Sequence, residues 1–186
     1  MTTASVRRHV TDIDEWTKLG QANIFPPESH LELIDGEILE MAPIGFKHAG
    51  HVTRLMNLFA LGLGDKAIMT AQNPLQLGDL SEPEPDFMLL RPDAEFYTKR
   101  HPKAEDVLLL VEVADSSLDY DQTTKLSLYA RYHIAEYWLL NLNDSCLEVY
   151  RQPKGSLYQQ KNTLRRGDEI TLLQLDYLTI QVGDII

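Results

Sequence analysis

The sequence predicts an α/β protein, more closely an α+β mixed sheet flanked by helices. Three observations favour this class. The run 107–114 is apolar apart from one acid, which is typical of a strand buried on both faces. An amphipathic helical pattern precedes this run and another follows it. The middle of the chain therefore follows the order helix, strand, strand, strand, helix, strand, which gives a mixed sheet with helices packed against it.

The first elements are a short helix and a hairpin. Thr11, followed by Asp14 and Glu15, resembles a helix N-terminus, and Gly20 suits the end of that helix. The segments 31–34 and 37–41 flank Asp35-Gly36, which is a strong hairpin signal.

A longer helix is predicted after Pro43, because apolar residues recur there at helical spacing. Strands are expected near 67–72, 74–78, 85–90 and at 107–114. In the helix predicted after Pro43, the residues expected on the buried face are Val52, Leu55, Met56, Phe59, Ala60 and Leu63.

A second major helix is predicted over 121–133, followed by a buried strand at 137–142. The segments 147–150 and 155–158 then predict a C-terminal β-meander, and the tail from Ile170 alternates apolar and polar residues. In the helix predicted over 121–133, the residues expected on the buried face are Leu126, Tyr129, Ala130 and His133.

Length and composition favour one domain over residues 1–186, with its core at about 48–142. The single cysteine, Cys146, rules out a disulfide within the chain. No segment approaches the roughly 18 apolar residues of a membrane span, and the N-terminus has no apolar signal region. We therefore expect a cytoplasmic protein without a membrane partner.

The net charge of −11 argues against nucleic acid as the default partner, since phosphate binding usually leaves a basic footprint. Local basic clusters soften this objection, although such clusters are equally typical of a solvated surface. They are Lys99-Arg100-His101 with Lys103, then Lys161, Arg165 and Arg166, and Arg7 with Arg8.

Three residues could carry chemistry together. Glu112 is an acid inside the apolar run 107–114, and a buried carboxylate is costly unless another group pairs with it. Asp86 has a similar setting at the start of a neighbouring strand, and Lys125 lies on the following helix. Two carboxylates can hold Mg²⁺, or Mn²⁺ in its place, and a lysine can stabilise charge on a phosphate.

Each candidate also has an ordinary interpretation. Asp86 follows a proline and suits a turn, and Glu112 could pair with a buried arginine. Lys125 lies four residues after Asp121, which is typical of a surface salt bridge, and it falls at the edge of the predicted apolar stripe.

Two further residues are candidates for the same site. Glu37 follows the hairpin turn and could add a metal ligand, or could lie on a solvent face. His48, near the start of the first long helix, is a candidate ligand or substrate-binding residue, although such a histidine more often caps or packs.

The segments Pro85-Asp86, Glu112-Val-Ala114, Asp121-x-x-x-Lys125 and Glu136-Tyr-Trp138 resemble the Uma2 family of restriction endonucleases, within the PD-(D/E)XK nuclease superfamily. The resemblance extends from about residue 12 to the end. It implies a restriction-endonuclease-like core, with Asp86 and Glu112 as the metal-binding acids. The superfamily lysine two places after the second acid is absent, because Ala114 occupies that position, and Lys125 is the family's replacement on the next helix.

The first functional hypothesis is a Mg²⁺-dependent endonuclease that hydrolyses phosphodiester bonds in DNA. The alternative is a non-catalytic binding or interaction module that retains the nuclease fold, which the acidic charge and Ala114 both favour. A third possibility is a phosphodiesterase for RNA or for a small phosphorylated substrate. A homodimer is expected, because two-fold dimers are the commonest oligomers and cutting both strands requires two sites.

Overall fold

The structure is a computed structural model that describes residues 7–186, and these residues divide into two compact units. One unit holds the chain up to Pro43 together with Gln76–Pro83, and the other holds Ile44–Leu75 and Glu84–Ile186. Asp86, Glu112, Lys125 and His48 all belong to the second unit, whereas Glu37 belongs to the first.

The first unit contains the predicted helix and hairpin. Helix α1 (Ile13–Gln21) begins after Asp12, whose carboxylate accepts a hydrogen bond from the backbone N–H of Glu15 at 2.8 Å. The N-cap is therefore Asp12 rather than Thr11, since its carboxylate satisfies an N–H of the first turn. Strands β1 (Leu31–Ile34) and β2 (Glu37–Glu40) pair in antiparallel register.

The turn of this hairpin requires glycine at its second position. Asp35 and Gly36 have φ values of 51° and 78°, as a tight hairpin turn with two left-handed residues demands. A Cβ on Gly36 would lie 2.2 Å from the side chain of Val10, so even alanine would clash. The Asp35-Gly36 signal in the sequence is thereby explained both by backbone conformation and by packing.

The second unit is built on one six-stranded sheet in the order β3-β4-β5-β6-β7-β8. Every neighbouring pair is antiparallel except β5 and β6, which run parallel because the helical segment between them crosses back over the sheet. The strands are β3 (Ile68–Thr70), β4 (Phe87–Leu90), β5 (Val107–Ala114), β6 (Glu136–Asn141), β7 (Cys146–Lys154) and β8 (Leu157–Leu164).

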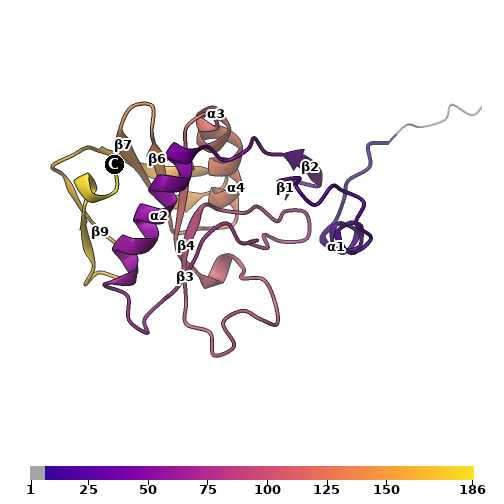
Figure 1. The fold of residues 1–186 in the computed structure, drawn as a ribbon, viewed down its shortest axis with the longest axis horizontal. Coiled ribbons are helices and arrows are strands. Elements are labelled where there is room, and N and C mark those ends of the chain that lie inside the picture. Colours follow the sequence, from indigo (N-terminus) through magenta and orange to yellow (C-terminus); the bar gives the residue numbers. More distant parts are fainter. Residues whose placement is uncertain (1–6) are drawn as a thin grey trace, which may run out of the picture. The chain divides into compact units, whose positions relative to one another are not determined.

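Helices pack against this sheet (Figure 1). Helix α2 (Phe46–Ala60) crosses strands β3, β4 and β5. The crossover between β5 and β6 is one continuous helical segment that packs on β7 and β8, made of α3 (Leu118–Tyr120), a π-helical turn (Asp121–Lys125) and α4 (Leu126–Arg131). The predicted mixed sheet, the helix-strand-strand-strand-helix-strand order and the C-terminal meander are confirmed.

Alternation along β5 assigns its side chains to opposite faces of the sheet. Leu109, Val111 and Val113 join the main hydrophobic core, which α2 also enters. Glu112 lies between two of these residues and therefore faces the other way, toward the helical segment 118–131. The C-terminal strands β9 (Glu169–Thr171) and β10 (Thr179–Gln181) add Ile170 and Ile180 to the core, and short 3₁₀ turns occupy Ala104–Asp106 and Val182–Asp184.

Three details of the predicted elements are wrong. Segment 74–78 forms no strand and makes only isolated bridges, at Gln76 and Leu77, and Pro74 has no N–H to donate to a ladder. Met56 and Ala60 on α2 are exposed, because the buried stripe is narrower than predicted. On the second helix His133 is exposed at φ 59°, beyond the last helical turn, and Leu128 is buried instead.

Candidate active site

Asp86 and Glu112 hold each other in place at the adjoining strands β4 and β5. The Oδ2 atom of Asp86 accepts a hydrogen bond from the N–H of Val113 at 2.8 Å. The Oε2 atom of Glu112 accepts one from the N–H of Asp86 at 3.2 Å. Because each carboxylate is bonded to the backbone of the other's strand, the antiparallel pairing of β4 with β5 fixes the separation of the two acids.

Lys125 reaches the same place from the helical segment. Its Nζ atom donates to Oε1 of Glu112 at 3.0 Å, and both side chains are almost fully buried, with exposed fractions of 5% and 3%. The two residues are separated by only 13 positions, because the helical segment folds directly back over the end of β5. Lys125, predicted at the edge of the apolar stripe, is buried.

The turn that presents Lys125 is a π-helix rather than an α-helix. The N–H of Leu126 donates to the carbonyl of Asp121, five residues earlier. Single π turns are rare and occur most often at functional sites, where they widen the helix locally to aim a side chain. A side-chain tether holds this turn to strand β7, since the amide of Gln122 donates to both carboxylate oxygens of Glu148 at 3.0 and 3.1 Å.

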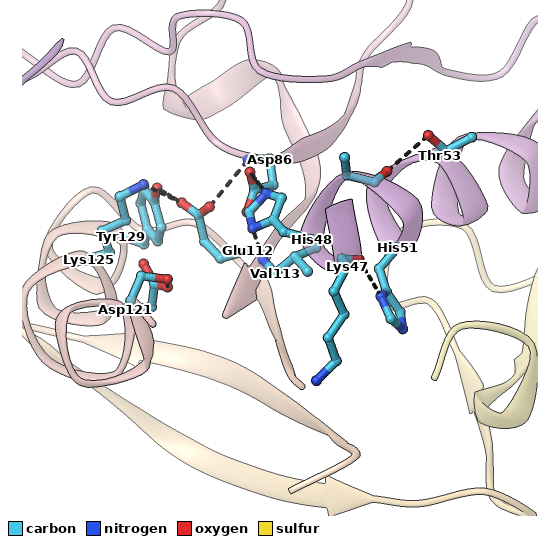
Figure 2. Close-up of polar contacts among 12 residues, drawn as sticks. Lys47, His48, His51, Thr53, Asp86, Glu112, Val113, Asp121, Lys125 and Tyr129 are labelled. Carbon is cyan, nitrogen blue, oxygen red and sulfur yellow. Dashed lines mark hydrogen bonds and ion pairs between the residues drawn. The ribbon is translucent and has the colours of Figure 1, made fainter. Parts of the chain in front are cut away.

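Helix α2 contributes His48 to the group. Its Nε2 atom donates to Oδ1 of Asp86 at 2.7 Å (Figure 2). Burial, the largest influence, lowers the pKa of His48, but the hydrogen bond and charge of Asp86 and the charge of Asp121 outweigh it, so the pKa is raised. His48 and Asp86 are the more solvent-exposed side of the group, with exposed fractions of 17% and 12%.

Tyr129 and Asp121 are part of the arrangement, although sequence reasoning assigned them other roles. The hydroxyl of Tyr129 donates to Oε1 of Glu112 at 2.5 Å, the atom that Lys125 also contacts. Asp121 is 3% exposed, so its predicted interpretation as part of a surface salt bridge is wrong. The spacing i, i+4, i+8 of Asp121, Lys125 and Tyr129 was a signal for one polar stripe, but the tyrosine fitted an apolar face equally well.

Glu37 is the one predicted site residue outside this unit. It lies at the start of β2, is exposed, and forms an ion pair with Arg8. Its predicted role as a further metal ligand stays a prediction.

The donor atoms suit a hard divalent cation. Mg²⁺ is typically held by one or two carboxylates and keeps several water ligands, so Asp86 and Glu112 supply enough protein oxygen atoms. Within residues 7–186 no group of three or more His, Cys, Asp or Glu side chains is arranged to hold an ion. A metal held here would take its protein ligands from two carboxylates and complete its coordination with water.

Residues 7–186 contain no helix that is both long and apolar enough to cross a membrane.

Comparisons with known proteins agree with this architecture. The model of the Uma2 family, described as "Putative restriction endonuclease", matches residues 13–183. The chain also resembles a crystal structure described as a putative nuclease belonging to DUF820 from Anabaena variabilis ATCC 29413, with a TM-score of 0.72 and 15% sequence identity over 94% of this chain and 96% of the other. At that identity the likeness establishes the fold. A comparison with curated proteins gave no match. Since the family model spans nearly the whole sequence, the chain belongs to the Uma2 family of putative restriction endonucleases.

Proposed function

We propose that this protein is a metal-dependent endonuclease that hydrolyses phosphodiester bonds in DNA. One observation carries the proposal. The carboxylate of Asp86 accepts from the N–H of Val113, that of Glu112 accepts from the N–H of Asp86, and the buried ammonium of Lys125 lies 3.0 Å from Glu112. Family membership supports nuclease chemistry, and the metal and the DNA substrate are the parts that the proposal adds.

Asp86 and Glu112 would hold Mg²⁺, with Mn²⁺ as a substitute, and Glu37 is a candidate for a further ligand, direct or through water. When bound, the ion supplies an activated water and neutralises charge on the scissile phosphate. Lys125 orients Glu112 and offers its positive charge to the phosphate, in place of the lysine absent at Ala114. His48 fixes the rotamer of Asp86 through the bond to Oδ1. Hydrolysis adds water across one P–O bond and leaves a phosphate monoester and a hydroxyl.

Cleavage of supercoiled plasmid tests the proposal. Full-length protein should nick the plasmid with Mg²⁺ or Mn²⁺ but not with EDTA, and Asp86→Ala and Lys125→Ala should each reduce the rate by about 100-fold or more. Glu105→Ala and Lys99→Ala are matched controls, because they remove the same charges from exposed positions. Equal cleavage by the wild type and both site variants would mean that the activity comes from another protein. Parallel reactions with RNA and with a chromogenic phosphodiester identify the substrate class.

A non-catalytic binding module is the second candidate. The observation that favours it is that both oxygens of Asp86 and both oxygens of Glu112 already accept hydrogen bonds from protein groups. Calorimetry with Mg²⁺ and Mn²⁺ distinguishes the two functions. Absence of binding at millimolar metal, together with intact plasmid, would favour the module.

The homodimer belongs to the same proposal, since two active sites are needed to cut both strands. Light scattering coupled to gel filtration should give twice the chain mass of 21.2 kDa.

A further inference from the structure

We infer that a row of basic side chains on α2 forms the surface that binds the phosphate backbone of the nucleic acid, an inference that rests on the proposed nuclease function. The surface consists of Lys47, His51 and Arg54 and is called here the α2 stripe.

Charge along the sequence singles out this helix. The chain contains 28 acidic residues, yet no Asp or Glu occurs between Glu40 and Asp65. Helix α2 lies wholly within that interval. In a protein with a net charge of −11, an acid-free helix with basic side chains is the kind of local field that attracts a polyanion.

The members of the stripe occupy one face of the helix. Positions 47, 51 and 54 are spaced i, i+4 and i+7, which places them in a row. Figure 2 shows Lys47 and His51 extending to the same side of α2, while His48 points to Asp86. Lys47 and Arg54 are exposed. The stripe therefore begins one residue from the histidine that contacts the candidate metal ligand.

The positive charges of the stripe are not paired with Asp or Glu side chains within residues 7–186. Lys47 donates to the carbonyl of Leu142 at 3.1 Å, and Arg54 donates to the backbone oxygen of Ile186 at 3.2 Å. His51 likewise contacts the carbonyl of Lys47 at 2.8 Å. Among the residues that the structure describes, none of the three contacts an acidic side chain. The charges of Lys47 and Arg54 are thus available to an external anion.

Several members of the basic clusters that are prominent in the sequence differ in this respect. Lys99 pairs with Glu95, Arg100 with Asp106, Lys161 with Glu148 and Arg8 with Glu37. An ion pair within the protein must be broken or shared before its cation can bind a phosphate, which weakens these clusters as a binding surface. Those clusters stand out as runs of adjacent basic residues, whereas the stripe is visible only at helical spacing.

Its length suits several phosphates. From Lys47 to Arg54 the helix rises about 10 Å, at 1.5 Å per residue. One strand of B-DNA presents a phosphate about every 3.4 Å along the axis, so the stripe spans about three of them. Phosphates bound along α2 would lead the strand to the end of the helix at which His48 meets Asp86.

Binding in EDTA, where cleavage is suppressed, tests the inference by fluorescence anisotropy with a labelled DNA duplex of 20 base pairs. The variant Lys47→Gln/His51→Gln/Arg54→Gln should bind about 10-fold or more weakly at 0.1 M salt. Its slope of log affinity against log salt should be shallower by about two, one for each lost cation. The control Lys99→Gln/His101→Gln/Lys154→Gln likewise removes one histidine and two cations, from other exposed positions, and should stay within about twofold of the wild type.

A charge-preserving variant, Lys47→Arg/Arg54→Lys, should retain binding, and thermal unfolding of every variant checks the fold. Undiminished binding by the stripe variant, or an equal loss in the control, would overturn the inference while leaving the nuclease proposal intact. A wild type that neither binds nor cuts DNA would instead overturn the proposed function, and the stripe with it. Duplex and single-stranded RNA serve as further arms, because they carry the same phosphates on a different sugar.

Discussion

The carboxylate of Glu112 depends on the groups around it for its burial. A charge removed from water is costly, and here the ammonium of Lys125 and the hydroxyl of Tyr129 meet one oxygen while the N–H of Asp86 meets the other. These three hydrogen bonds therefore offset the cost of burying the Glu112 carboxylate as well as stabilising the fold.

Removing only the lysine should expose this dependence. Lys125→Met leaves Glu112 buried without its cation, and breaking a buried pair in this way typically costs about 3–5 kcal/mol of unfolding free energy. Urea unfolding followed by fluorescence measures the change. The double variant Glu112→Gln/Lys125→Met should recover most of the loss, since no charge stays behind. If the double variant is destabilised by the sum of the two single variants, the two residues do not interact energetically.

Tyr129 should act as a positioning residue for Glu112. Tyr129→Phe removes one donor from Oε1 and keeps the ring, so the carboxylate is held less firmly and Mn²⁺ should bind about 10-fold more weakly. Titration followed by electron paramagnetic resonance measures this without turnover. Tyr158→Phe is the control, because its hydroxyl bonds the carbonyl of Ile134. Equal Mn²⁺ affinity in Tyr129→Phe and the wild type would exclude the positioning role.

At the scale of elements, an ion pair between Arg100 and Asp106 stabilises the connection from β4 to β5. The guanidinium of Arg100 contacts Asp106 at 2.5 and 3.0 Å, and the N–H of Lys103 donates to the same carboxylate at 2.8 Å. The hydrogen bond from Arg100 is the largest influence and, against burial, it lowers the pKa of Asp106 below its usual 3.8.

The ion pair between Arg100 and Asp106 should make the stability of the fold depend on pH in the acidic range. A carboxyl whose pKa is lower in the folded state stabilises the fold above its unfolded pKa, and this contribution is lost as the pH falls through the folded pKa. Wild-type protein should therefore lose stability below about pH 4 more steeply than Asp106→Asn. Thermal melts between pH 3 and pH 7 compare the two, and identical slopes would show that the ion pair contributes nothing.

For the whole molecule, metal binding should be linked to stability. A ligand that binds only the folded state raises its stability by RT ln(1 + [L]/Kd), about 2.7 kcal/mol at 100 times Kd. Millimolar Mn²⁺ should then raise the Tm of the wild type. Asp86→Asn keeps the shape of the side chain and removes its charge, so its Tm should not respond. A response of the same size in both proteins would place the ion elsewhere.

Local signals predicted the elements well because they are written in neighbouring residues. The apolar run 107–114 and the Asp35-Gly36 turn coincide with β5 and the hairpin. The errors arose where tertiary context decides, as in segment 74–78, where Leu75 and Leu77 alternate with other residues as in a strand. Alternation and helical spacing identify which faces are buried, but they are only accurate to about a residue at the edge of a stripe.

The sequence by itself determined the order of helices and strands, the membership of the Uma2 family and the acids at the ends of β4 and β5, because periodicity and residue type carry that information. Only the tertiary structure decided that His48 meets an acid 38 residues away, that Lys125 is buried against Glu112, and that Tyr129 shares this contact. The physical reason is that such contacts depend on how the helices cross the sheet. That crossing is set by the packing of the whole core, and no single segment encodes it.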